Sequence, residues 1–411
     1  MGVQDYTQRR WIILAASCII NLCIGSLYAW SVFADPMADH LASIAGTEEQ
    51  NLSLVFTVAN GIGPVTLISG GIINDRIGPR RLIIGGGILF GAGMIASGFA
   101  TSLAMLLVTY GLGVGLGVGM VYGATIGNAV KFFPDRRGFV GGIATAAYGI
   151  SSVIVPLAAN ALIDSYGVAN AFKVLGVGML AVICICGLFV ERCPEGFAPE
   201  GWIPRASTAT HIGTTDKDWR EMLADPIFFI MIAMLCCGAF SGLMITSQAS
   251  PIAQDMMGMG PAQAALIVSM LALLNTAGRV VSGFLSDKLG SIATIQGVFV
   301  LTATSMAMLF ISSTSAEWVF YLGICGAGFC FGSIMGIYPG FTASQFGLRH
   351  NSVNYGIMFC GFAAAGLIGP SIMSVIRGSC ESYAPAFLVA VALAILGLAL
   401  TFLFKRKANN S

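Results

Sequence analysis

Charged side chains are scarce in this sequence of 411 residues. Asp, Glu, Lys and Arg make up 9% of it, whereas an average soluble domain contains about 25%. One stretch, residues 82–130, continues for 49 positions without a single charge. A water-facing surface cannot be built from such a stretch, so the composition excludes a soluble globular protein. It predicts an integral membrane protein whose main partner is the lipid bilayer.

Several chemical signals are also missing. The net charge is only +1, which gives no reason to expect a nucleic-acid partner. The eleven cysteines lie mostly in apolar segments, without CxxC pairs or an accompanying histidine cluster. We therefore expect no disulfide framework, metal site or cofactor. Polar catalytic groups do not gather at one interface, and long soluble extensions are lacking. These absences argue against a membrane enzyme and against a non-transporting sensor.

Twelve segments are apolar enough to span a membrane, because about 20 such residues cross the hydrocarbon core. The long run is divided at residues 100–102, since 49 helical residues would cross the core more than twice. The expected spans are 11–33, 52–73, 82–100, 103–127, 138–162, 173–190, 226–249, 262–286, 292–313, 318–341, 352–376 and 384–404.

The basic residues orient these spans. Seventeen of the twenty Lys and Arg residues fall on one side of the predicted topology. Lys173 and Arg377 fall on the other side, and Arg279 lies within a span. Because basic loops stay in the cytoplasm, both termini are predicted to be cytoplasmic in a bacterial-type cytoplasmic membrane.

The chain contains an internal repeat. "GGIINDRIGPRR" (residues 70–81) resembles "SGFLSDKLGSIA" (residues 282–293), with Asp75 matching Asp287 at an offset of 212. Glycines of the fourth span match those of the tenth at an offset of 213. We therefore expect two six-helix bundles, 1–190 and 226–411, joined by a cytoplasmic linker, 191–225. Such repeats are typical of transporters that alternate access to a central site.

The repeated loops resemble the signature G-x-x-x-D-[RK]-x-G-[RK]-[RK] of the major facilitator superfamily, and the resemblance extends over the whole chain. It implies an all-α membrane fold of twelve helices in two pseudo-symmetric bundles. The loop residues are interpreted as a gate, in which Asp75 pairs with Arg76, Arg80 and Arg81 across a helix seam. Asp287 and Lys288 form the second copy. The alternative is ordinary positive-inside charge.

Arg279 is the one charge deep inside a span, where an ionised side chain costs about 2.5–3.5 kcal/mol or more. Snorkelling towards the interface is the structural alternative. No acidic residue lies at a similar depth in the predicted spans. A guanidinium matches a carboxylate bidentately, so the sequence predicts a small carboxylate as its partner. Phosphate is disfavoured, because a single cation would face about two negative charges.

Four stretches narrow the resemblance to the oxalate/formate antiporter family, which is related to monocarboxylate transporters. They are "RRWIILAASCIINLCIGSLYAWSVF", "VKFFPDRRGFVGGIATAAYGIS", "NTAGRVVSGFLSDKLG" and "FGLRHNSVNYGIMFCGFAAAGLIG". The resemblance implies that Arg279 binds the substrate carboxylate. It also implies an aromatic enclosure, whose matching positions are Tyr28, Tyr122, Tyr148, Phe331 and Phe359. Asn275 and Phe362 occupy further positions of the family's site and complete the predicted substrate-binding set.

Two departures from the family pattern bear on the substrate and on coupling. The oxalate exchanger has a second cation, a lysine, where this chain has Phe362, which argues against a dicarboxylate. Proton-coupled monocarboxylate transporters have an aspartate where this chain has Asn275. Asp255, at the outer end of the same hairpin, is then the candidate proton-coupling residue, although an ordinary solvated loop carboxylate is the favoured interpretation.

The sequence thus favours a secondary active transporter of a small monocarboxylate of the lactate, pyruvate or formate class. Proton symport is the expected coupling, with the proton entering on the acid itself or through water near Arg279. An anion exchanger of the oxalate/formate type is the main alternative, and a sensor without flux is the second. The protein is expected to act as a monomer.

Overall fold

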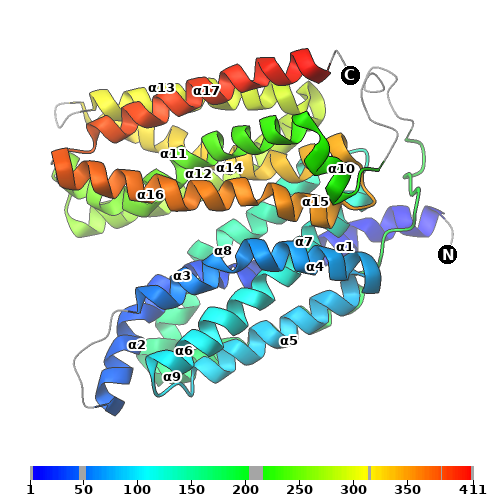
Figure 1. The fold of residues 1–411 in the computed structure, drawn as a ribbon. Coiled ribbons are helices and arrows are strands. Elements are labelled where there is room, and N and C mark those ends of the chain that lie inside the picture. The colour runs from blue at the N-terminus through cyan, green and yellow to red at the C-terminus, as the bar shows by residue number, and fades with distance from the viewer. Residues whose placement is uncertain (1–2, 46–51, 203–215, 313–315, 381, 409–411) are drawn as a thin grey trace. The chain divides into compact units, whose positions relative to one another are not determined.

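The computed structural model describes residues 3–45, 52–202, 216–312, 316–380 and 382–408, and the regular elements of these residues are all helices (Figure 1). Twelve helical segments are long and apolar enough to cross a membrane. The predicted all-α fold with twelve spans is therefore confirmed, and each predicted span overlaps one of these segments. Part of the predicted linker, including Pro204, Arg205 and His211, lies outside the described residues.

Contacts divide the chain into two compact units. Unit 1 comprises residues 1–134, 147–201 and 350–357, and unit 2 comprises residues 135–146, 202–349 and 358–411. Each unit thus includes one short segment that is remote in sequence from its main part. In unit 1 that segment is nearly all of one helix, Asn351–Met358, and in unit 2 it is the beginning of another, Arg137–Tyr166.

The helices have the following bounds. Up to the linker they are α1 (Val3–Ile24), η1 (Gly25–Ala29), α2 (Trp30–Ala45), α3 (Ser53–Gly61), α4 (Gly63–Ile77), α5 (Pro79–Ser97), α6 (Leu103–Leu106), η2 (Leu107–Val114), α7 (Gly115–Phe132), α8 (Arg137–Tyr166) and α9 (Val168–Phe189). From the linker onwards they are α10 (Trp219–Ala224), α11 (Pro226–Met257), α12 (Pro261–Leu289), α13 (Ser291–Ile311), α14 (Glu317–Phe346), α15 (Asn351–Met358), α16 (Cys360–Cys380) and α17 (Ala384–Ala408).

The first span is longer than predicted. The helical segment extends from Asp5 to Ile44, 40 residues, whereas the sequence pattern indicated only 11–33. At 1.5 Å per residue this length is about 60 Å, which is roughly twice the hydrocarbon thickness. A 3₁₀ turn, η1, interrupts the segment at Gly25–Ala29. Hydropathy alone did not reveal this continuation, because charged residues near Asp35 end the apolar window.

Two boundaries follow directly from the local sequence. The charge-free run is divided as predicted, since α5 ends at Ser97 and the Ser102 side chain caps the next helix by accepting the Met105 amide. In the repeated loops, Gly78 and Gly290 have φ of +86° and +88°, and each separates two consecutive helices. A residue with a Cβ is disfavoured at such angles, which explains why glycine recurs at these matching positions.

Candidate substrate site and loop contacts

Arg279 lies in α12 with only 5% of its surface exposed. Its Nε donates to Asn275 Oδ1 one turn earlier, at 2.9 Å, and its Nη1 donates to the Thr145 carbonyl of α8 at 2.8 Å. Both acceptors are neutral. Among the residues that the structure describes, no carboxylate oxygen lies within 4.0 Å of the guanidinium. The side chain is therefore held in place within unit 2 while its positive charge is not matched by a described acidic group.

Neighbouring glycines fix the backbone around Arg279. A Cβ at Gly336 of α14 would lie 2.7 Å from the Arg279 Cα, and one at Gly142 of α8 would lie 3.1 Å from the Arg279 carbonyl carbon. Gly332 of α14 has the same relation to Asn275, whose carbonyl carbon would lie 2.6 Å from the added Cβ. Small residues thus allow three helices of unit 2 to approach closely. This packing determines where the guanidinium is presented.

The three predicted phenylalanines form one cluster in unit 2. The rings of Phe359 and Phe362 have centroids 4.6 Å apart, and Phe362 stacks on Phe331 at 6.3 Å with an interplanar angle of 6°. Phe331 is buried and directly precedes Gly332, the residue that abuts Asn275. Phe362 therefore lies in an aromatic environment. A lysine at this position would lose both ring contacts and introduce a positive charge.

The three predicted tyrosines form a separate cluster in unit 1. Tyr148 of α8 is at the centre, with its ring 4.8 Å from Tyr122 of α7 and 5.3 Å from Tyr28 of η1. Tyr122 and Tyr148 are buried, whereas Tyr28 is 36% exposed. The structure thus places the three tyrosines together in unit 1 and the other five predicted binding residues in unit 2, three of them in the phenylalanine cluster. Their role in binding stays a prediction.

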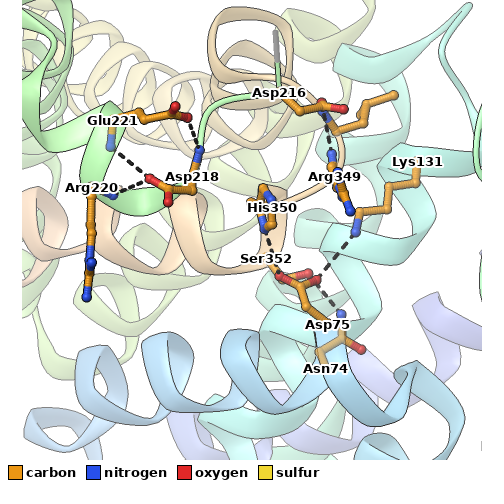
Figure 2. A network of polar contacts seen from close by, with 11 residues as sticks. Asn74, Asp75, Lys131, Asp216, Asp218, Arg220, Glu221, Arg349, His350 and Ser352 are labelled. Atoms are coloured by element: carbon orange, nitrogen blue, oxygen red, sulfur yellow. Dashed lines mark hydrogen bonds and ion pairs between the residues drawn. The ribbon is translucent and has the colours of Figure 1, made fainter.

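Asp75, at the end of α4, has partners other than those predicted (Figure 2). Its Oδ1 lies 3.6 Å from Lys131 Nζ of α7, and its Oδ2 lies 4.0 Å from His350 Nδ1 at the start of α15. The adjacent Asn74 Nδ2 donates to Ser352 Oγ at 2.9 Å. These contacts join three elements of unit 1. In the described part of the chain, Asp75 contacts Lys131 and His350 rather than the arginines of its own loop, and the gating role of these residues stays a prediction.

Arg80 of that loop contacts the end of α9 and the start of the linker. Arg80 Nη2 lies 3.5 Å from Glu191 Oε1, and Arg80 Nε donates to the Val190 carbonyl at 3.1 Å. Arg9 Nη1 donates to the same Glu191 oxygen at 3.2 Å, and Arg76 is exposed. The physical reason is local, because α5 begins directly after Gly78 and directs Arg80 towards the end of α9. Arg80 therefore holds the start of the linker.

Asp287 of the second repeat copy binds backbone rather than side chains. Its Oδ1 accepts the Gly138 amide and its Oδ2 accepts the Phe139 amide, both at 2.7 Å. These are among the first amides of α8, which have no partner within the helix, so the carboxylate satisfies both and interacts favourably with the helix dipole. Lys288 takes no part in this contact, because its Nζ lies over the Phe284 ring at 4.5 Å.

Asp255, the candidate proton-coupling residue, is part of a surface ion pair. Its Oδ2 accepts from Arg377 Nη2 at 2.9 Å and from the Tyr383 hydroxyl at 3.2 Å, and its side chain is 45% exposed. Burial raises the pKa of Tyr383 above its ordinary value. The contacts tie the end of α11 to the end of α16 and the start of α17 in unit 2. A coupling role for Asp255 stays a prediction.

Sequence analysis missed several of these partners. The Thr145 acceptor is a backbone carbonyl, which no side-chain pattern can reveal. Lys131, His350 and Ser352 are polar residues of ordinary type at helix ends. One signal was present, because the offset of 213 aligns the starts of α8 and α15, Arg137 with His350. That alignment indicates that both repeated aspartates contact the start of a helix.

Comparison with known sequences identifies the family. The sequence model of the Major Facilitator Superfamily matches residues 11–370 of this chain. The chain belongs to the major facilitator superfamily. It is accordingly a multi-pass membrane transporter rather than an enzyme.

Relatives of this superfamily member include three of similar length. An uncharacterized MFS-type transporter of Escherichia coli (strain K12) is 28% identical over 367 residues, 88% of this chain and 87% of that protein. The oxalate:formate antiporter of Oxalobacter formigenes is 28% identical over 402 residues, 97% of this chain and 92% of that protein. Monocarboxylate transporter 11 of Mus musculus is 26% identical over 402 residues, 94% and 85% of the two chains.

Solved structures support the fold independently. The superfamily transporter FucP, determined in the outward conformation, matches 97% of this chain and 99% of its own with a TM-score of 0.72 at 14% identity. The human organic anion transporter MFSD10 (TETRAN) matches 96% of this chain and 99% of its own with a TM-score of 0.72 at 13% identity. At these identities the likeness concerns the fold alone.

Proposed function

We propose that this superfamily member is a secondary active transporter of a small monocarboxylate, of the lactate, pyruvate or formate class, that works by alternating access. Arg279 is the anion anchor. The observation that carries the proposal is its environment: a buried guanidinium held by two neutral acceptors, with no described carboxylate within 4.0 Å. A substrate carboxylate would compensate a charge that the described protein groups do not.

The aromatic cluster supports a monocarboxylate over a dicarboxylate. A second carboxylate of the substrate would need a second cation, and Phe362 lies between two other rings instead. Rings favour a short apolar tail beside the single charged end. The names of two relatives, an oxalate:formate antiporter and a monocarboxylate transporter, are consistent with a small carboxylate substrate.

Proton symport, with the proton entering on the acid itself, is the coupling proposed from the sequence. A specific observation favours a second candidate, anion exchange. The partner of Arg279 Nε is the amide of Asn275, which does not titrate, so a bound anion neutralises the site and its release leaves a buried cation. A buried unpaired charge is costly, which would slow the return of the unloaded carrier and make exchange faster than net flux.

Counterflow of labelled lactate, pyruvate, formate and oxalate in proteoliposomes tests both proposals, with and without a pH gradient. We expect rapid uptake of the monocarboxylates and little uptake of oxalate. Net uptake that follows the pH gradient would support symport, and uptake that requires internal substrate would support exchange. Arg279→Lys should abolish most uptake, because an ammonium lacks the planar fork; full uptake by this variant would overturn the anchor. A chain without any flux would favour the sensor.

Orientation and assembly complete the proposal. We infer that both termini face the cytoplasm, that the membrane is a bacterial-type cytoplasmic membrane, and that one copy is sufficient for transport. The distribution of Lys and Arg supports the orientation. Labelling of single cysteines introduced near each terminus in intact cells tests it, since labelling by a membrane-impermeant reagent from outside would contradict the assignment.

A further inference from the structure

The first turns of α8 are fastened to α12 at three levels, all within unit 2. At one end Asp287 accepts two α8 amides at 2.7 Å. In the middle, Gly142 of α8 and Gly283 of α12 approach closely, with 3.2 Å between a Cβ built at Gly283 and the Gly142 Cα. At the other end Arg279 Nη1 donates to the Thr145 carbonyl at 2.8 Å. Only this last contact uses the proposed substrate-binding group.

The first repeat copy contains the same helix pair without a cation. There, α15 packs on α4 within unit 1, and a Cβ at Gly71 would lie 2.8 Å from the Ser352 carbonyl carbon. Gly356 of α15 lies equally close to α4, since a Cβ built at Gly356 would be 3.0 Å from the Leu67 carbonyl carbon. The offset of 212 that matches Asp75 with Asp287 also matches Leu67 with Arg279. The arginine is thus an addition to a contact that a leucine completes in the first copy.

A carboxylate would weaken the bond between Arg279 and Thr145. The single Nε hydrogen is already given to Asn275, so a bidentate carboxylate must use Nη1 and Nη2. Nη1 carries two hydrogens, so the carboxylate takes the one that is not given to the Thr145 carbonyl. A bond between two ions is stronger than a bond from a cation to a neutral carbonyl, so the carboxylate determines where Nη1 lies and draws it away from the carbonyl. The carboxylate also partly neutralises the positive charge of Arg279, which weakens the hydrogen bond from Nη1 to the Thr145 carbonyl.

We propose that the hydrogen bond from Arg279 to the Thr145 carbonyl is a latch between α12 and α8 that substrate binding releases. The latch rests on the proposed function, because it needs a carboxylate at Arg279. Residues 137–146 of α8 belong to unit 2 and residues 147–166 to unit 1, so the latch acts on a helix that both units share. Substrate binding thereby allows α8 to move relative to α12. Thr145 acts only as a positioning group, through its backbone carbonyl.

Hydrogen–deuterium exchange of the purified full-length protein measures the latch directly. In Arg279→Leu, without substrate, we expect the amides of residues 138–149 to exchange about tenfold faster than in the wild type, because a charge-assisted bond is lost. Residues 350–357 should not change. Leu67→Ala is the matched control at the equivalent position, and it should raise exchange at 350–357 and leave 138–149 unchanged. Arg279→Gln replaces Arg279→Leu if the latter does not fold.

Substrate effects on the wild type complete the test, with lactate as the probe. The shift in unfolding temperature reports binding, and exchange at 138–149 reports the latch. Binding with faster exchange supports the proposal. Binding with unchanged or slower exchange, or an Arg279→Leu protein that exchanges like the wild type, overturns the latch and leaves the anchor intact. If lactate, pyruvate and formate all fail to shift the unfolding temperature, the proposed function falls, and the latch with it.

Discussion

Phe362→Lys should shift the substrate preference of the transporter from monocarboxylates towards dicarboxylates. The residue is half-buried in α16, where its ring contacts Phe331 and Phe359. The lysine would bring an ammonium into an aromatic cluster of unit 2, the unit that also contains Arg279. Two cations in place of one match the two carboxylates of oxalate. The same change leaves a monocarboxylate with one unused cation.

The expected magnitude follows from what is lost and gained. Each ring contact contributes about 0.5–1.5 kcal/mol beyond burial, so removing two lowers the free energy of unfolding by about 1–3 kcal/mol. A hydrogen bond between the ammonium and a second carboxylate contributes about 1.5–3 kcal/mol to oxalate binding. By the relation of about 1.4 kcal/mol per factor of ten, oxalate affinity rises about 10- to 150-fold relative to lactate.

Competition in counterflow measures this change. Labelled lactate is taken up by proteoliposomes in the presence of increasing unlabelled oxalate, and the concentration for half inhibition is compared between variants. Phe362→Met is the matched control, since it removes the ring without adding charge. Equal oxalate inhibition of Phe362→Lys and Phe362→Met, in protein that still transports lactate, would refute the reasoning that Phe362 determines the substrate class.

Three further predictions concern stability and reactivity. Asp287→Ala leaves two α8 amides without their cap and should lower the free energy of unfolding by about 1–2 kcal/mol, measured by thermal unfolding in detergent. Gly332→Ala forces a Cβ against the backbone of α12 and should destabilise by about 1–3 kcal/mol, whereas Gly297→Ala, which meets open space, should not. Burial raises the pKa of Cys193 to about 12, so its thiolate is about one part in ten thousand at pH 8, and maleimide should label the exposed Cys380 much faster.

The fold was predictable because its main determinants are local. Apolar segments bounded by charge define helices that span a bilayer, and twelve of them are present in the structure as predicted. The repeat, which was visible in the sequence, includes Gly78 and Gly290, and both lie at helix ends with positive φ. The exact extent of α1 to α2 was not predictable, because a helix that continues past its apolar window carries no hydropathy signal there.

The candidate site was only partly predictable. Depth and isolation identified Arg279 as an unusual cation, and the structure confirms that it is buried. Its partners were not foreseen, since one is a backbone carbonyl and the other, Asn275, was predicted to bind substrate rather than to hold Arg279. The partners of Asp75 are Lys131 of α7 and His350, which directly precedes α15. They lie more than fifty and more than two hundred residues away in the chain. Contacts of that range depend on packing, which local periodicity does not encode.

The two repeat copies have become different in a way that bears on how the protein works. In the first copy Asp75 holds the side chains of Lys131 and His350 at 3.6 and 4.0 Å, contacts that salt screens and that restrict long rotamers. In the second copy Asp287 binds two backbone amides at 2.7 Å, which are already fixed by the helix. The second contact is therefore the firmer of the two. A ligand that is to loosen the firmer contact must act on it directly, and Arg279, at the far end of that contact, is the group that a carboxylate would engage.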